Sequence, residues 1–235
     1  MEYYTLLLFG GLVGMQHALE ADHLAAVAAM SAGRSSRRAL ILRGSFWGVG
    51  HTATLLTICG MLILWGGTIS ERTQSLLELA VAVMIMGLGG NVLYRLWRQR
   101  PHFHFHRHGP RVTHLHAHVH EAESIPHTRS AHAHGHESLG LKRAIMVGMV
   151  HGTAGSAGLL VLAASAGTMV EAISYVLAFG AGSILGMAAL SFVASYPLGF
   201  LEKCAGWMNT AALATIGCAA MFIGLRLFTE NWVAL

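Results

Sequence analysis

Charged residues are scarce in this chain. Only 11% of its 235 residues are Asp, Glu, Lys or Arg, whereas 54% are hydrophobic; an average soluble domain is about one quarter charged. With so little charge and so much apolar side chain, the chain could not cover itself with an ordinary soluble surface. The sequence therefore predicts a membrane protein.

Several motifs are also missing. The three cysteines show neither CxxC nor zinc-type spacing, so neither a disulfide framework nor a thiolate metal site is indicated. There is no GxxxxGK[ST] loop, and as far as motifs can tell this excludes ATP hydrolysis. The apolar stretches contain neither HExxH nor the HxxHH boxes of membrane metalloenzymes. We therefore expect no enzyme and no resident cofactor, with a membrane metalloenzyme as the least favoured alternative.

Long apolar runs dominate what is present. A bilayer-spanning helix needs about 20 apolar residues, and six stretches qualify: roughly 4–30, 46–66, 76–97, 144–166, 172–195 and 206–228. The predicted fold class is an all-α polytopic membrane protein with six transmembrane helices.

The positive residues predict the orientation of these helices. Lys and Arg are concentrated in the connection at 34–43 and at both ends of the third connection, at 95–100 and 142–143. Short cytoplasmic connections are enriched in these residues. We therefore expect both termini outside the cytoplasmic membrane and the third connection in the cytoplasm. The net charge of +4 then needs no nucleic acid to explain it.

The two halves of the chain resemble each other. "GMQHALEADHLAAVAAMSAG" (14–33) aligns without a gap with "GMVHGTAGSAGLLVLAASAG" (148–167). Two further pairs follow in the same order, "WGVGHT" (47–52) with "FGAGSI" (179–184) and "AVMIMGL" (82–88) with "AAMFIGL" (219–225). One match per helix predicts a three-helix duplication, and an odd number of helices orients the halves oppositely, as in many secondary transporters. Chance recurrence of small residues in membrane helices is the alternative.

This duplication divides the chain into three predicted parts. Residues 1–97 form the first three-helix repeat, residues 98–141 a His-rich cytoplasmic loop, and residues 142–235 the second three-helix repeat.

The 16 histidines fall into two groups. Twelve lie between residues 102 and 136, and the other four lie in predicted spans: His17, His23, His51 and His151. Ionisable groups at membrane depth are costly and usually mark a site or a pathway. In "HALEADH" (17–23), Glu20 and Asp22 stand between two of these histidines. Imidazole and carboxylate without thiolate suit a borderline divalent cation such as nickel, cobalt or zinc.

In a regular helix, the His and Asp side chains of this segment could not all point toward one ion. At about 100° per residue, Asp22 and His23 lie about 140° and 240° around the axis from His17. As one helix, residues 4–33 would measure about 45 Å, against a hydrocarbon core of about 30 Å. Both facts predict that the first helix is broken by an unwound turn that lines a cavity. The alternative is a continuous helix with its polar groups in the interfacial layer.

The other two histidines each have a structural alternative. His51 could serve only to hydrogen-bond Thr52 or a backbone carbonyl of a neighbouring helix. His151, which is flanked by small residues, could equally have a purely structural role.

These motifs resemble a known family. "HALEADH" fits the H-x4-D-H signature of the nickel/cobalt transporter family (NiCoT), and "FWGVGHTATLL" (46–56) resembles its second motif. "HGTAGSAGLL" (151–160) is similar to the UreH-like, urease-accessory branch of nickel permeases. The acidic motifs that follow in larger members are missing here. The resemblance implies six to eight membrane helices and transport of nickel or cobalt.

The resemblance also implies roles for individual residues. His17, Asp22 and His23 would select and carry the metal, with His51 close behind them. Two more candidates do not come from the family signature: Glu20 is proposed as a proton-coupling or rim-coordinating group because it is a carboxylate at membrane depth, and His151 is proposed as an additional pathway residue from the internal repeat and the branch resemblance. Metallochaperones or nickel-enzyme maturation proteins would be the partners, and the transported Ni²⁺ or Co²⁺ would be the ligand.

The His-rich loop is a separate candidate site. Its runs "HFHFHRH", "HLHAHVH" and "HAHGH" alternate His with other residues, and no packed core or regular structure is expected there. We predict that it collects or buffers the ion through auxiliary ligands: His102, His104, His106, His108, His114, His116, His118, His120, His132, His134 and His136. A solubilising linker without a metal role is the alternative.

The predicted function is secondary transport of nickel or cobalt, most favourably uptake. An inside-negative potential contributes roughly 4.6 kcal/mol per 100 mV to a divalent ion that enters. A nickel/cobalt exporter of the same superfamily, used for metal resistance, is the alternative, since the His-rich loop suits it nearly as well. Affinity order alone does not choose among nickel, cobalt and zinc.

Overall fold

The structure, a computed structural model, describes residues 3–32, 36–65, 67–99, 102–108, 112–118, 136–154, 168–201 and 206–235. Its helices are α1 (Tyr3–His17), α2 (Ala21–Ser31), α3 (Arg37–Trp65), α4 (Glu71–Gln99), α5 (His136–His151), α7 (Met169–Leu201) and α8 (Gly206–Val233). Among these residues, α3, α4, α7 and α8 are long and apolar enough to cross a membrane. The prediction of a helical membrane protein is confirmed.

The helices differ from the predicted spans mainly at their ends. α3 begins at Arg37 rather than near residue 46. The Arg residues before residue 46 lower the hydropathy of this segment, but Arg, Ala and Leu all favour a helix. α7 continues through Pro197 to Leu201, as membrane helices can. The fourth predicted span begins inside α5, but residues 155–167 lie outside the described part of the chain.

The first predicted span is interrupted where "HALEADH" stands. α1 ends at His17 and α2 begins at Ala21. The backbone N–H groups of Leu19 and Glu20 bond the carbonyls of Gln16 and His17 in a tight turn. Glu20 then has extended backbone angles, φ −64° and ψ 151°. The structure thus contains the break that the length and side-chain directions of this segment predict.

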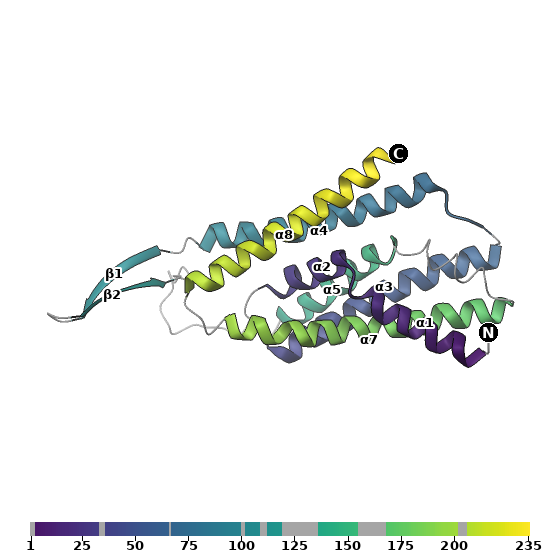
Figure 1. The fold of residues 1–235 in the computed structure, drawn as a ribbon, viewed down its shortest axis with the longest axis horizontal. Coiled ribbons are helices and arrows are strands. Elements are labelled where there is room, and N and C mark those ends of the chain that lie inside the picture. The colour runs from purple at the N-terminus through teal and green to yellow at the C-terminus, as the bar shows by residue number, and fades with distance from the viewer. Residues whose placement is uncertain are drawn as a thin grey trace.

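The helices are arranged in two groups. α1, α2, α3, α5 and α7 lie together, while α4 and α8 run side by side as a separate pair (Figure 1). α2 contacts both members of that pair. Large apolar side chains such as Leu185 and Val193 remain more than half exposed on the outside. Such surfaces are unfavourable in water but suit the hydrocarbon of a bilayer.

Glycine allows the closest helix approaches. A Cβ at Gly14 in α1 would overlap the backbone of Phe179 in α7, and one at Gly148 in α5 would overlap the backbone of Trp47 in α3. In such packing, small residues let helix backbones come close enough for extensive van der Waals contact. These contacts hold the ends of α1 and α5 against the middle of the bundle.

The first part of the His-rich segment is more regular than expected. Strands β1 (His102–His108) and β2 (Val112–His118) pair antiparallel, with His104 opposite His116. The expectation of no regular structure is therefore wrong for these strands, because alternation with a period of two also suits a strand. The hairpin projects from one end of the molecule, whereas both termini lie toward the other end (Figure 1).

Candidate metal site

The four histidines of the predicted spans come together at the break between α1 and α2. His17 is the last residue of α1, His23 lies in the first turn of α2, His51 lies within α3, and His151 ends α5. The ring centroid of His23 is 4.5 Å from that of His17, 5.4 Å from that of His51 and 4.0 Å from that of His151. We refer to these four residues, with Glu20 and Asp22, as the histidine cluster.

The imidazoles of this cluster are shielded from solvent. His23, His51 and His151 are at most 1% exposed, and the side chain of His17 is 12% exposed. The indole ring of Trp47 lies 5.4 Å from the ring of His23 and 5.6 Å from that of His151. The indole of Trp47 thus covers one side of the cluster, and the imidazoles lie in surroundings where polar groups need partners.

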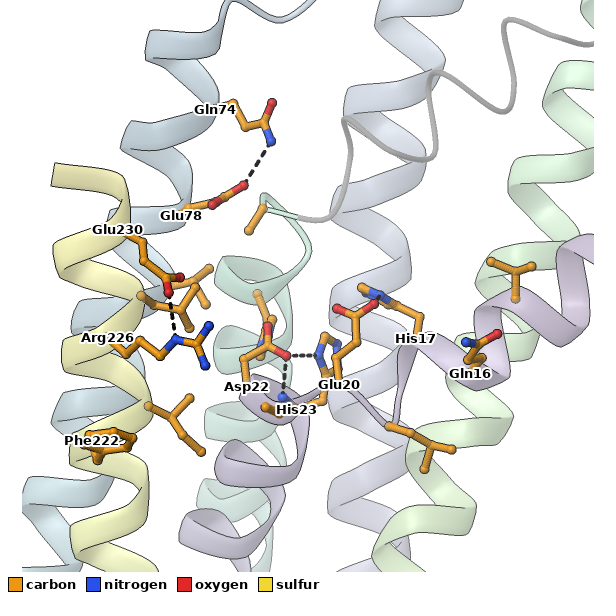
Figure 2. A pocket seen from close by; sticks show the side chains of 18 of the residues that line it. Gln16, His17, Glu20, Asp22, His23, Gln74, Glu78, Phe222, Arg226 and Glu230 are labelled. Atoms are coloured by element: carbon orange, nitrogen blue, oxygen red, sulfur yellow. Dashed lines mark hydrogen bonds and ion pairs between the residues drawn. The ribbon is translucent and has the colours of Figure 1, made fainter. Parts of the chain in front are cut away.

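Asp22 connects two of the histidines. Its Oδ1 accepts the backbone N–H of His23 at 2.8 Å and lies 2.9 Å from Nδ1 of the same residue. Its Oδ2 lies 2.8 Å from Nε2 of His151. Figure 2 shows Asp22 and His23 side by side at the start of α2. One carboxylate thus joins the helix break to the end of α5.

Glu20 has a similar relation to His17. Its Oε1 lies 2.8 Å from Nδ1 of His17, and Figure 2 shows the two side chains meeting above the break. Glu20 is 57% exposed at its side chain, whereas that of Asp22 is 20% exposed. Glu20 therefore approaches the cluster from its more solvent-exposed side, and Asp22 approaches it from the more buried side.

The remaining ring nitrogens have no hydrogen-bond partner. Among the described residues, this set comprises Nε2 of His17, Nε2 of His23, both nitrogens of His51 and Nδ1 of His151. An unpaired buried polar group costs about 1–3 kcal/mol, so several at one place need an explanation. The alternative that His51 bonds Thr52 or a carbonyl does not hold, because neither of its ring nitrogens has a hydrogen-bond partner; the hydroxyl of Thr52 donates to the carbonyl of Gly180.

These donor atoms are close enough to share a metal ion. Ligand atoms of His17, His23 and His51 lie within 4.8 Å of one another, and so do those of Asp22, His23 and His151. Imidazole nitrogens bind borderline divalent metals at about 2.0–2.1 Å. Small side-chain movements would therefore bring three of them onto one ion.

A cavity of about 980 Å³ lies beside the cluster. His17, Glu20, Asp22, His23 and His151 are on one side of it. The facing wall belongs to α4 and α8, and its polar residues are Gln74, Glu78, Arg226 and Glu230 (Figure 2). The amide of Gln74 donates to Glu78 at 3.0 Å, and Nε of Arg226 donates to Glu230 at 2.7 Å. The cluster thus borders a space large enough for a hydrated ion.

The facing wall was missed in the sequence. Among the acidic residues, only Glu20 and Asp22 are predicted from the sequence as site residues, yet Glu78 lies within α4 and lines the same cavity. Its position near the end of an apolar stretch could have marked it as a candidate site residue, since ionisable groups in membrane helices are often functional. Which way it faces depends on the packing of α4 against α8, and sequence alone does not show this.

The loop histidines are not part of the cluster. Those on β1 and β2 belong to the projecting hairpin (Figure 1), and His136 is the first residue of α5. Three others predicted as auxiliary ligands lie outside the described residues: His120, His132 and His134.

The chain is similar to a curated protein, the urease accessory protein UreH of Bacillus sp. (strain TB-90). The two are 29% identical over 198 residues, which cover 84% of this chain and 79% of that protein. No family model matches the chain, and no solved structure matches it. The relative confirms the resemblance to the UreH-like branch. It also agrees with the prediction that the chain is not an enzyme, since the relative is named an accessory protein.

Proposed function

We propose that this relative of UreH is a permease that carries divalent nickel or cobalt across the cytoplasmic membrane. The observation that supports it best is the meeting of unpartnered imidazole nitrogens from α1, α2, α3 and α5 at a helix break. Neither cysteine that the structure describes, Cys59 or Cys218, belongs to this cluster. Imidazole with carboxylate suits nickel and cobalt better than soft copper(I). The residues proposed to form the metal site, as ligands or beside them, are His17, Asp22, His23 and His51, with His151 next to them.

The proposed direction is uptake. With the Arg-rich connection at 34–43 in the cytoplasm, both termini are outside, which agrees with their lying toward one end of the molecule (Figure 1). The cavity is lined by Gln74 and Glu78 near the start of α4 and by Glu230 near the end of α8. In this orientation it lies on the outer side of the cluster. A potential of 100 mV then favours entry of a divalent ion by a concentration ratio of order 10³.

The proposed architecture is two inverted repeats, residues 1–97 and 142–235. The approach of Gly14 to Phe179 and that of Gly148 to Trp47 occur at aligned positions of the two halves. The helices that correspond, α3 with α7 and α4 with α8, pack against each other. This is the arrangement expected when one repeat is related to the other by a two-fold axis.

A second pair of contacts supports the same symmetry. A Cβ at Gly48 would lie 2.9 Å from the Cα of Ile184, and one at Gly180 would overlap the side chain of Thr52. These four positions also correspond in the alignment of residues 47–52 with residues 179–184. The repeat accounts for His151 in the cluster, since it aligns with His17.

The His-rich loop is proposed to collect the ion after it enters. In the orientation above, the β1–β2 hairpin is cytoplasmic and lies at the far end of the molecule from the termini (Figure 1). Neutral imidazoles are good ligands near neutral pH. The ion would pass from this loop to proteins that mature a nickel enzyme, a role that the name of the relative supports.

Nickel flux into proteoliposomes at a fixed inside-negative potential tests the function. We compare the wild type with His23→Ala and with Gln74→Ala, a polar residue of the same cavity that does not contact the cluster. The expected result is nickel entry in the wild type and in Gln74→Ala and none in His23→Ala, with all three folded by size-exclusion chromatography. Equal flux with and without His23, or no flux in the wild type, would contradict the proposal. Efflux that persists against the potential in the presence of a proton gradient would instead indicate an exporter.

A further inference from the structure

Each carboxylate of the cluster faces the Nδ1 atom of a different histidine ring. Oε1 of Glu20 lies 2.8 Å from Nδ1 of His17, and Oδ1 of Asp22 lies 2.9 Å from Nδ1 of His23. An ionised carboxylate can only accept hydrogen bonds. Each Nδ1 must therefore carry the hydrogen. In a neutral imidazole the other nitrogen, Nε2, then carries the lone pair, and Nε2 of both rings has no partner.

We infer that the imidazoles of His17, His23 and His51 bind the ion, while Glu20 and Asp22 act as positioning residues that never touch it. The inference rests on the proposed function, since it concerns the same ion. Histidines that bind metals commonly donate their second N–H to a carboxylate, which fixes the ring orientation and makes the ligand more basic. The ligand atoms of these three histidines already lie within 4.8 Å of one another.

The hydrogen bonds of Asp22 leave it little capacity for a metal. Oδ1 accepts the backbone N–H of His23 as well as facing its ring, and Oδ2 faces Nε2 of His151. Three of its roughly four lone-pair sites are thus engaged, and they hold the carboxylate at Nδ1 of His23 rather than at the unpartnered Nε2 of that ring. Held where it is, it orients His23 toward the ion and ties α2 to α5. His151 thereby supports Asp22, and its place in the cluster needs no metal bond.

The charges are consistent with this division. Three neutral imidazoles leave the two positive charges of the ion uncompensated, and a buried charge is costly unless countercharges are near. Glu20 and Asp22 supply two negative charges one imidazole away. A transported ion must also leave its site, and conduction requires binding that is weak enough to release it. Countercharges behind the ligands attract the ion without binding it directly.

Paired substitutions of Glu20 test the inference through Ni²⁺ flux kinetics in proteoliposomes. Glu20→Gln keeps an oxygen that accepts the Nδ1 hydrogen of His17, but a neutral amide is a poor metal ligand. Glu20→Ala removes the acceptor. Glu20→Gln loses the countercharge but keeps the acceptor, so for a positioning residue we expect it to lower the apparent affinity clearly less than Glu20→Ala, which should lower it about 10–100-fold. An equal loss in both variants would identify Glu20 as a ligand and overturn the inference.

X-ray absorption of bound Ni²⁺ tests Asp22 directly. The full chain is used with its twelve loop histidines replaced by serine, so that only the cluster histidines remain. We expect three imidazoles around the ion and the same coordination shell in Asp22→Asn. A carboxylate oxygen that disappears from the shell in Asp22→Asn would overturn the inference.

A matched control and the wild type separate this inference from the proposed function. Glu171→Gln changes a carboxylate that does not line the cavity and that accepts the backbone N–H of Thr168 rather than an imidazole hydrogen, and it should leave both affinity and coordination unchanged. Absence of Ni²⁺ flux in the wild type would reject the proposed function and the inference together. Flux by the wild type with a carboxylate in the coordination shell would reject the inference alone.

Discussion

Asp22 and His151 are joined by a contact of 2.8 Å between Oδ2 and Nε2, although 129 residues separate them in the chain. The contact links the break between α1 and α2 to the end of α5. Both residues line the cavity. A movement of α5 would therefore shift Asp22, and with it the ring of His23, which contacts the same carboxylate. This is a physical connection between the two halves of the chain at the site itself.

Replacement of His51 should separate metal binding from stability. Neither ring nitrogen of His51 has a partner and the residue is fully buried, so His51→Leu removes an unsatisfied polar group. We expect unchanged or higher stability without metal, by up to about 1–3 kcal/mol, together with loss of nickel transport. Thermal unfolding in detergent with a chelator and flux in proteoliposomes measure the two effects.

Thr52→Val is the matched control for that experiment. The hydroxyl of Thr52 is buried and donates to the carbonyl of Gly180 at 3.1 Å. Its loss should cost about 1 kcal/mol of stability and leave nickel binding in place. A stability loss in His51→Leu as large as that in Thr52→Val would argue for a structural role of the imidazole.

Nickel should stabilise the folded protein. A ligand that binds only the native state raises stability by about 2.7 kcal/mol at 100 times its Kd. We expect a Ni²⁺-dependent rise in Tm that EDTA reverses and that His23→Ala abolishes. Replacing the twelve loop histidines by serine should preserve the rise, because it originates in the helices. If the rise depended on the loop alone, the cluster would not be the principal site.

The loop histidines should affect capacity rather than translocation. Replacing them by serine is expected to lower the apparent nickel affinity or the amount accumulated, while transport at saturating nickel continues. The reason is that the described hairpin lies apart from the cluster (Figure 1). Initial rates over a range of nickel concentrations measure this, and a complete loss at saturation would mean that the loop belongs to the pathway.

Alanine at aligned glycines should test the helix packing of both halves. A Cβ at Gly14 or at Gly148 would overlap the backbone of a neighbouring helix, so either substitution should cost about 1–3 kcal/mol. Gly60 and Gly87 lie in helices with nothing within 4 Å of an added Cβ, and alanine there should stabilise by about 0.5–1 kcal/mol. Thermal unfolding of the four variants is the measurement. Similar values at all four positions would contradict the close helix contacts.

Much of the site could be predicted because its signals are local. The length of the first apolar stretch and the directions of His17 and His23 required a break, and the structure has one between α1 and α2. The role of His151 was harder to predict, since it depended on a weak repeat. Glu78 was missed because its face of α4 becomes relevant only when α8 packs beside it. The strands of the His-rich segment were missed because their alternation also suits an unstructured tract.

Composition and local sequence are enough to show that the chain lives in a membrane and that imidazole and carboxylate meet in its first span. These follow from composition and from neighbours in the chain, which no packing can change. The packing of the helices, in contrast, sets which ring nitrogens face carboxylates and which remain unpartnered, and it brings His51 and His151 to His17 and His23. Those relations depend on the register between helices, which close glycine contacts between distant segments help to set. Hydrogen bonds and metal ligation are sensitive to distances of that size, and a one-dimensional pattern does not contain them.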